Sequence, residues 1–85
     1  MTIQNDAQEI LQFTYNEYIQ NRRITPERLK EHFNSWDGHR IDRAVKYLRD
    51  INAIQIVLLL GNHEGIQNFI LEKITPLGIK LIENQ

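Results

Sequence analysis

The sequence contains no cysteine, so disulfide bonds and thiolate metal sites are excluded. This composition fits a reducing compartment, and we expect a cytoplasmic protein. No run of about twenty apolar residues could cross a membrane. The stretch from Met1 to Asp6 lacks the basic and apolar regions of a signal peptide. We therefore expect neither a membrane partner nor a secreted product.

Neither sign of charge is in large excess, because the formal net charge at pH 7 is -1. Phosphate binding usually leaves a basic total, so this value by itself disfavours a nucleic-acid partner. The bases are concentrated, however: eight of the ten Lys and Arg residues lie between Arg22 and Arg49. If the protein has an anionic partner, this middle segment is where it is expected to dock.

The length of 85 residues and the 41% hydrophobic content are typical of one globular domain spanning residues 1–85. The stretch from Asp6 to about Arg22 contains neither glycine nor proline, and its apolar residues recur at helical spacing. It predicts a first helix over residues 6–22. Phe13 falls outside the apolar face of that helix, and we expect it to be partly exposed.

Two short helices are predicted next, over residues 26–34 and 38–51. Thr25 and Pro26 are typical of a helix start, and Asp37 is the expected cap of the following helix. Asn52 tolerates the left-handed conformation in which helices often end. Two short helices that meet across such a turn suggest a helix-turn-helix.

The last third of the sequence predicts a β-hairpin and a short helix. Apolar and β-branched runs over residues 54–60 and 66–74 flank a turn-forming segment, Gly61 to Gly65. Thr75 and Pro76 repeat the earlier helix-start pattern and predict a final helix over residues 76–83. The fold class is therefore α+β, with a three-helix core, a two-stranded hairpin and a short C-terminal helix.

This order of elements resembles the winged helix-turn-helix superfamily, particularly small prokaryotic regulators of the MarR and PadR type. The segment Arg40 to Leu48 resembles a recognition helix, and Leu71 to Ile82 resembles the exit from a wing. The resemblance implies a DNA-binding transcriptional regulator with helix 38–51 in the major groove. The turn Gly61 to Gly65 contains no Arg or Lys, so a basic contact from the wing is not expected.

The exposed side of helix 38–51 is the predicted DNA-contacting face. Arg can bond bidentately to guanine, and Asp can accept a hydrogen bond from cytosine. The alternative is that these charges only solvate the helix, with Asp42 and Lys46 as an ordinary i,i+4 pair. The residues predicted to contact bases are His39, Arg40, Asp42 and Arg43, and those predicted to lie nearer the DNA backbone are Lys46 and Tyr47. The resemblance also implies phosphate contacts from Arg28 and Lys30, for which a solvated turn and helix end is a nearly equal alternative.

The rival functional class is a protein-interaction module that does not bind DNA. Apolar residues on the first and last helices suggest a homodimer or partner contact through Phe13, Leu77 and Leu81, and they equally suit a completed monomer core. The lone Trp36 is expected to cover the edge of the core more than to stack on a base.

No enzymatic function is expected, and neither a cofactor nor a metal is implied. Gly61-Asn62-His63-Glu64 resembles the short metal-binding block of metallophosphoesterases, but the further Asp and His motifs that those enzymes need are missing. His32, His39 and His63 have no metal-ligand spacing. Ser35 has no nucleophile-elbow context, and a turn or capping role suits it better.

Overall fold

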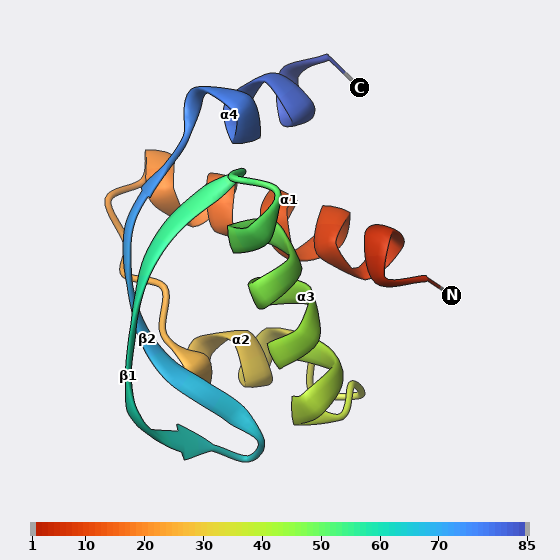
Figure 1. The fold of residues 1–85 in the computed structure, drawn as a ribbon, viewed down its shortest axis with the longest axis vertical. Helices are drawn as coiled ribbons and strands as arrows, with labels where there is room; N and C mark the ends of the chain where they lie inside the picture. The colour runs from red at the N-terminus through yellow and green to blue at the C-terminus, as the bar shows by residue number, and fades with distance from the viewer. Residues whose placement is uncertain (1, 85) are drawn as a thin grey trace.

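The computed structural model describes residues 2–84 as an α+β fold with four helices and one antiparallel hairpin, which confirms the predicted class. Helices α1 to α3 pack against one another while the hairpin arches beside them, and α4 lies at the far end (Figure 1). The elements are α1 (Ile3–Ile19), α2 (Pro26–His32), α3 (Gly38–Asp50), β1 (Ile54–His63), β2 (Ile66–Ile74) and α4 (Pro76–Glu83).

The prediction for the first helix was wrong at both ends. The helix begins at Ile3 because the Thr2 hydroxyl accepts a hydrogen bond from the Asn5 N–H at 3.1 Å. It ends at Ile19, and Asn21 then takes the left-handed conformation with φ 58°. Asn is one of the few residues that adopt this conformation readily, so the chain turns there and does not continue helically to residue 22.

The predicted caps of the other helices are confirmed. α2 ends two residues and α3 one residue earlier than expected, at His32 and Asp50. Asn52, with φ 65°, ends the helical segment as predicted. The three capping side chains are Thr25, Asp37 and Thr75, which accept hydrogen bonds from the backbone N–H groups of Arg28, His39 and Gly78.

The hairpin is longer and its turn tighter than predicted. β1 continues to His63, three residues beyond the expected end, because the pairing with β2 resumes there. Glu64 and Gly65 form the turn with φ values of 52° and 97°. Positive φ at both central residues is typical of the type I′ turn, whose twist matches that of the strands.

The core lies between α1, α2, α3 and the inner side of the hairpin. Its apolar side chains recur at helical spacing on the helices, and the hairpin adds Ile54 at the start of β1 and Ile66, Phe69 and Ile74 of β2. The largest fully buried side chains are Ile10, Leu11, Leu29, Ile41, Leu48, Ile66 and Pro26. α4 is fastened to α1 by the Tyr15 hydroxyl, which donates to the Glu83 carboxylate at 3.2 Å; this bond raises the pKa of Tyr15.

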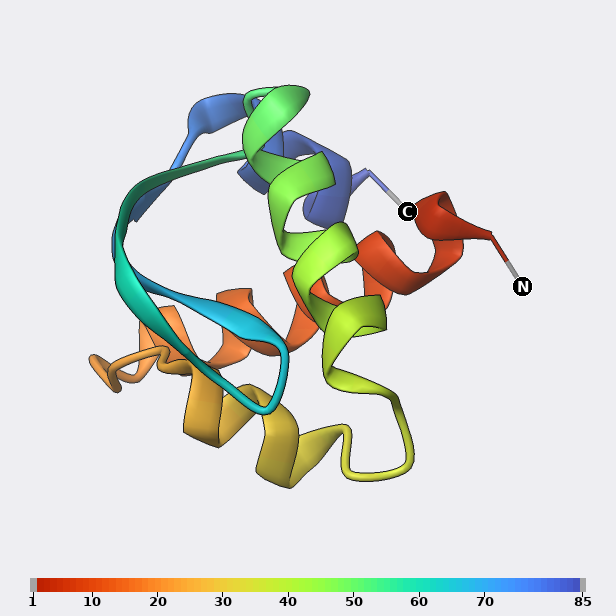
Figure 2. The same ribbon diagram turned by 60° about the horizontal axis from the view of Figure 1, so that its bottom comes forward.

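The base of the hairpin is held by the residues that follow α3, and its tip packs on the start of α3 (Figure 2). At the base, the Thr75 N–H donates to the Ala53 carbonyl at 3.1 Å, and the Thr75 hydroxyl donates to the Asn52 carbonyl at 2.6 Å. At the tip, a Cβ placed on Gly38 would lie 1.6 Å from the Glu64 carbonyl oxygen. Only glycine permits this close approach, so the start of α3 is packed directly on the turn.

Candidate nucleic-acid interface

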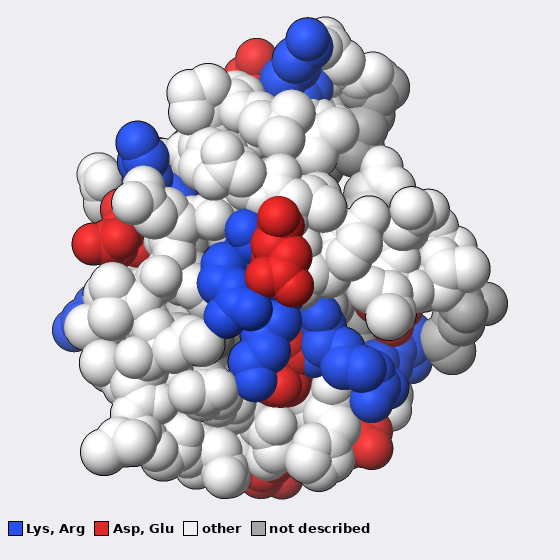
Figure 3. Space-filling model, viewed as in Figure 1, with Lys and Arg blue, Asp and Glu red and all other residues white. Residues whose placement is uncertain are grey.

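One side of α3 faces solvent along its whole length. The inward side is apolar, with buried Ile41, Ala44, Val45 and Leu48, so the helical repeat directs the charged residues outward. Lys and Arg side chains gather over this helix on the face seen in Figure 3, with acidic side chains among them. The residues on the outward side are His39, Arg43 and Asp50, which are exposed, and Lys46 and Arg49, which are half-buried.

Arg43 lies at the centre of the outward side. It is exposed, and within residues 2–84 it forms no ion pair. Arg49, by contrast, bonds to the neighbouring Asp50 carboxylate at 2.9 Å, a pair that stays largely exposed. Arg43 is therefore the cation of α3 whose hydrogen-bonding groups are available to a ligand.

Arg40, a predicted base-contacting residue, faces α1 instead of the outward side. Its guanidinium bonds to both Asp6 carboxylate oxygens, at 2.8 and 2.9 Å, and lies 3.8 Å above the centre of the Trp36 ring. The hydrogen bond from Arg40 lowers the pKa of Asp6, and the same bond raises the pKa of Arg40. Trp36 packs on Phe33 at the core edge, as predicted.

Asp42, a second predicted base contact, is occupied by the hairpin. Its Oδ1 accepts a hydrogen bond from the Gln67 N–H at 2.9 Å, and its Oδ2 lies 3.0 Å from the Lys46 ammonium. The side chain is 18% exposed. The carboxylate therefore docks β2 onto α3, and it also satisfies a strand N–H that points away from β1.

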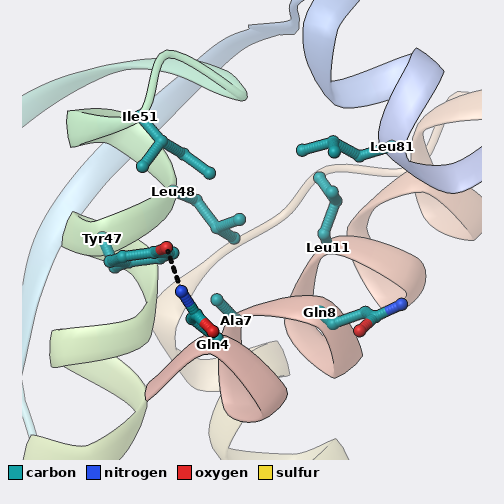
Figure 4. A pocket seen from close by; sticks show the side chains of 8 residues that line it. All are labelled: Gln4, Ala7, Gln8, Leu11, Tyr47, Leu48, Ile51 and Leu81. Atoms are coloured by element: carbon teal, nitrogen blue, oxygen red, sulfur yellow. Dashed lines mark hydrogen bonds between the residues drawn. The ribbon is translucent and has the colours of Figure 1, made fainter. Parts of the chain in front are cut away.

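Tyr47 is turned toward the N-terminal part of α1. Its hydroxyl accepts a hydrogen bond from the Gln4 side chain at 3.4 Å. It borders an open cavity of about 240 Å³ between α1, α3 and α4 (Figure 4). The other residues that line this mainly apolar cavity are Ala7, Gln8, Leu11, Leu48, Ile51 and Leu81.

The predicted phosphate contacts on α2 also have partners within the chain. Arg28 forms an ion pair with the buried Glu17 of α1 and donates to the Arg23 carbonyl at 3.1 Å. Lys30 donates to the Asn34 carbonyl at 3.2 Å. Arg28 thus ties α2 to the end of α1, whereas the Lys30 contact is an exposed one that a phosphate can replace.

The predicted partner contacts divide into two kinds. Phe13 is half-buried: its ring stacks on His32 with centroids 4.3 Å apart and meets Phe33 edge-on at 5.8 Å. It therefore packs α1 against α2. Leu77 and Leu81 of α4 are 42% and 41% exposed and remain available to a partner.

The histidines and acids of residues 2–84 do not form a metal site, since no group of three or more is suitably arranged. His63 lies 3.2 Å from the Glu64 carboxylate at the hairpin tip. No helix in this part of the chain is long and apolar enough to span a membrane.

Sequence reasoning missed two residues near this surface. Asp6 was not recognised as the partner of Arg40, since the two are far apart in sequence. Leu60 does lie in a strand, as predicted, but the 97% exposure of its side chain was not anticipated. The sequence could have indicated this exposure. The apolar run from Ile56 to Leu60 is unbroken, and successive side chains of a strand point to opposite faces, so a two-stranded hairpin cannot bury all of them.

Comparison of the chain with protein-family models, curated proteins and solved structures finds no match.

Proposed function

We propose that the protein is a winged helix domain that binds duplex DNA through the outward side of α3 and acts as a transcriptional regulator. α2, the turn and α3 correspond to the helix-turn-helix, and the β1–β2 hairpin corresponds to the wing. An α-helix fits the major groove of B-DNA, and helices of this kind dock with their N-terminal residues toward the base edges.

The observation that carries the proposal is the exposed Arg43 at the centre of the outward side of α3, which forms no ion pair within residues 2–84. His39 lies one turn before it and Lys46 one turn after it, so hydrogen-bond donors follow the helix along its outward side. A guanidinium in this place can bond bidentately to guanine or to a phosphate. Arg40 and Asp42 serve the proposal indirectly, because they fix α3 against α1 and the hairpin.

The net charge of -1 makes a single domain a weak DNA ligand. Two copies that present α3 to successive major grooves would bind far more tightly than one. We therefore include a homodimer in the proposal, with the exposed Leu77 and Leu81 of α4 as the dimer contacts.

The test is fluorescence anisotropy of a labelled mixed-sequence duplex, titrated with protein at several salt concentrations. Arg43→Ala is expected to lower the affinity for the duplex about tenfold. It should also reduce the slope of log affinity against log salt concentration by about one, since one fewer phosphate is neutralised. Lys80→Ala is the matched control, because Lys80 is an exposed base on α4. No duplex binding by the unaltered protein at low salt, or equal losses in the two variants, would contradict the proposal.

The second candidate is a protein-interaction module, and the open apolar cavity beside Leu81 favours it (Figure 4). An apolar side chain of a partner could fill this space between α1, α3 and α4. Sedimentation velocity of the unaltered protein and of Leu81→Asp distinguishes this candidate. The interaction-module candidate requires that the unaltered protein form an oligomer and that Leu81→Asp dissociate it. It also requires that neither protein bind the duplex.

A further inference from the structure

Within residues 2–84, β1 is paired with another strand on one side only. Near the tip of the hairpin, β2 lies between β1 and α3 (Figure 2), and the Gln67 N–H of β2 donates to Asp42 of α3. No hydrogen bond from outside the hairpin reaches the backbone of residues 55–62 in this part of the chain. β1 therefore presents a row of N–H and C=O groups along its outer edge.

This edge lacks the features that keep edge strands of monomeric proteins unpaired. Such strands are usually short, or they carry a charge or a proline. β1 extends over ten residues, from Ile54 to His63. It contains no proline, and no Lys, Arg, Asp or Glu occurs between Asp50 and Glu64. A long edge of this composition is typical of a strand that another strand covers.

The side chains of β1 show that the strand stands at the margin of the core. Residues 56–58 pair regularly with residues 69–71. Ile56 and Leu58 pack against the core but are only half-buried, whereas Phe69, the partner of Leu58, is buried. Val57 and its partner Ile70 lie on the outer face and are 43% and 46% exposed. Apolar surface on β1 is thus available to a neighbouring strand.

A bulge follows this regular stretch and turns Leu60 outward. Leu58 pairs with Phe69 and Asn62 with Gln67, so residues 59–61 stand opposite residue 68 alone. Gly61 has φ 92°, in the left-handed region that favours glycine, and lets the strand return to its ladder. Leu60 is 97% exposed, so an added strand that buries it would remove a large apolar side chain from water.

We propose that β1 pairs antiparallel with β1 of a second copy, about a two-fold axis near Val57, and so forms a continuous four-stranded sheet. In a two-fold contact every interaction occurs twice, and antiparallel pairing satisfies the N–H and C=O groups of both strands. A second copy fits this edge because neither strand brings a charge, so no like charges oppose each other. The pairing goes beyond the proposed function, and it stands whether or not the protein binds a duplex.

The experiment is sedimentation velocity over a range of protein concentrations. Every protein carries Leu81→Asp, so that the α4 contact proposed above does not contribute, and we expect this reference protein to dimerise. Adding Val57→Lys should raise the dimer dissociation constant about tenfold or more, because the two introduced charges meet near the two-fold axis. Ile70→Lys is the matched control. It introduces the same charge at a similarly exposed position, but one strand away from the contact, so the dimer should persist.

Hydrogen exchange gives a second readout that needs no substitution in β1. In the reference protein, the outward amides of residues 56–58 should exchange more slowly as the protein concentration rises. The Gln67 amide, which is bonded to Asp42, should not respond to concentration. Because Val57 and Ile70 are both well exposed, both lysine variants should retain the far-ultraviolet circular dichroism spectrum.

Three results would overturn the pairing of β1 with a second copy. The first is a reference protein that stays monomeric at every concentration. The second is a dimer that Val57→Lys leaves intact while the amides of residues 56–58 show no protection. The third is equal dissociation by Val57→Lys and Ile70→Lys, which would assign the contact to the outer face of the hairpin instead of the edge of β1.

Discussion

The two long edges of α3 are attached to the rest of the molecule by opposite arrangements of charge. On the edge toward α1, a base of α3 is held by an acid: Arg40 bonds to both oxygens of Asp6. On the edge toward the hairpin, an acid of α3 accepts a backbone N–H: Asp42 bonds to Gln67. Charged residues at the edges therefore fix the helix, and the strip between them is left to solvent.

This difference explains why neighbouring charged residues of one helix have unlike roles. Arg40 and Arg43 are three positions apart in the sequence, yet the first is bonded within the fold and the second is exposed. A charged side chain near the edge of a packed helix meets partners from the adjoining elements, while one at the centre of the free side meets water. Substitutions at each edge can test this division.

The largest effect is expected at the hairpin edge, at the start of α3. Gly38→Ala places a methyl group where the Glu64 carbonyl lies, so the turn must move. We expect the free energy of unfolding to fall by about 2–3 kcal/mol in urea titrations, as for other overpacked sites. Gly61→Ala is the control, with open space around the added atom but a positive φ, and should cost about 1 kcal/mol. If the two substitutions lower the free energy of unfolding equally, the close contact between Gly38 and the Glu64 carbonyl does not contribute to stability.

The α1 edge should give the next largest effect. Asp6→Asn removes the charge that Arg40 binds, and we expect a loss of about 1–2 kcal/mol of unfolding free energy at pH 7. The pKa of Asp6 is lowered in the folded state, so its stabilisation is complete above the unfolded value of 3.8 and is lost as the pH falls through the folded value. The stability difference between variant and unaltered protein should therefore shrink in acid.

The exposed Glu31 provides the control for this edge. Glu31→Gln should change stability little at any pH in the same titrations. A constant difference between Asp6→Asn and the unaltered protein from pH 7 to pH 2 would contradict the ion-pair explanation.

The smallest effect is expected at Asp42. Asp42→Ala removes the acceptor of the Gln67 N–H and should lower stability by about 1 kcal/mol, with faster hydrogen exchange of that amide. Asp42→Asn keeps an acceptor oxygen and should retain most of the stability. Its duplex affinity should be equal or higher, since a negative charge beside Lys46 is removed. A marked loss of affinity in Asp42→Asn would mean that the carboxylate does contact a base.

Local sequence chemistry predicted much of this fold. The caps at Thr25, Asp37 and Thr75 and the left-handed Asn52 all depend on neighbouring residues, and each prediction is confirmed. The end of α1 was missed although its cause is local, because Asn21 lies within a stretch without glycine or proline and was included in the helix.

The roles of the charged residues were predicted less well, because they depend on contacts distant in sequence. The helical repeat places Arg40 beside the outward strip, but only the approach of α1 brings Asp6 to its guanidinium. Likewise, the strand pattern gives no register, and the bulge that exposes Leu60 depends on how residues 59–61 align with β2. Helical periodicity thus identified the candidate face, while tertiary packing determined which of its side chains are available.

The attachments of the hairpin described above imply unequal timescales of motion along it. The Ala53 amide donates to the Leu48 carbonyl of α3, and the Thr75 amide donates to the Ala53 carbonyl, so both should exchange with solvent only when the whole domain unfolds. Residues 59–61 stand outside the regular ladder and can exchange through brief local openings. We therefore expect the amides of residues 59–61 to exchange faster than those of Ala53 and Thr75.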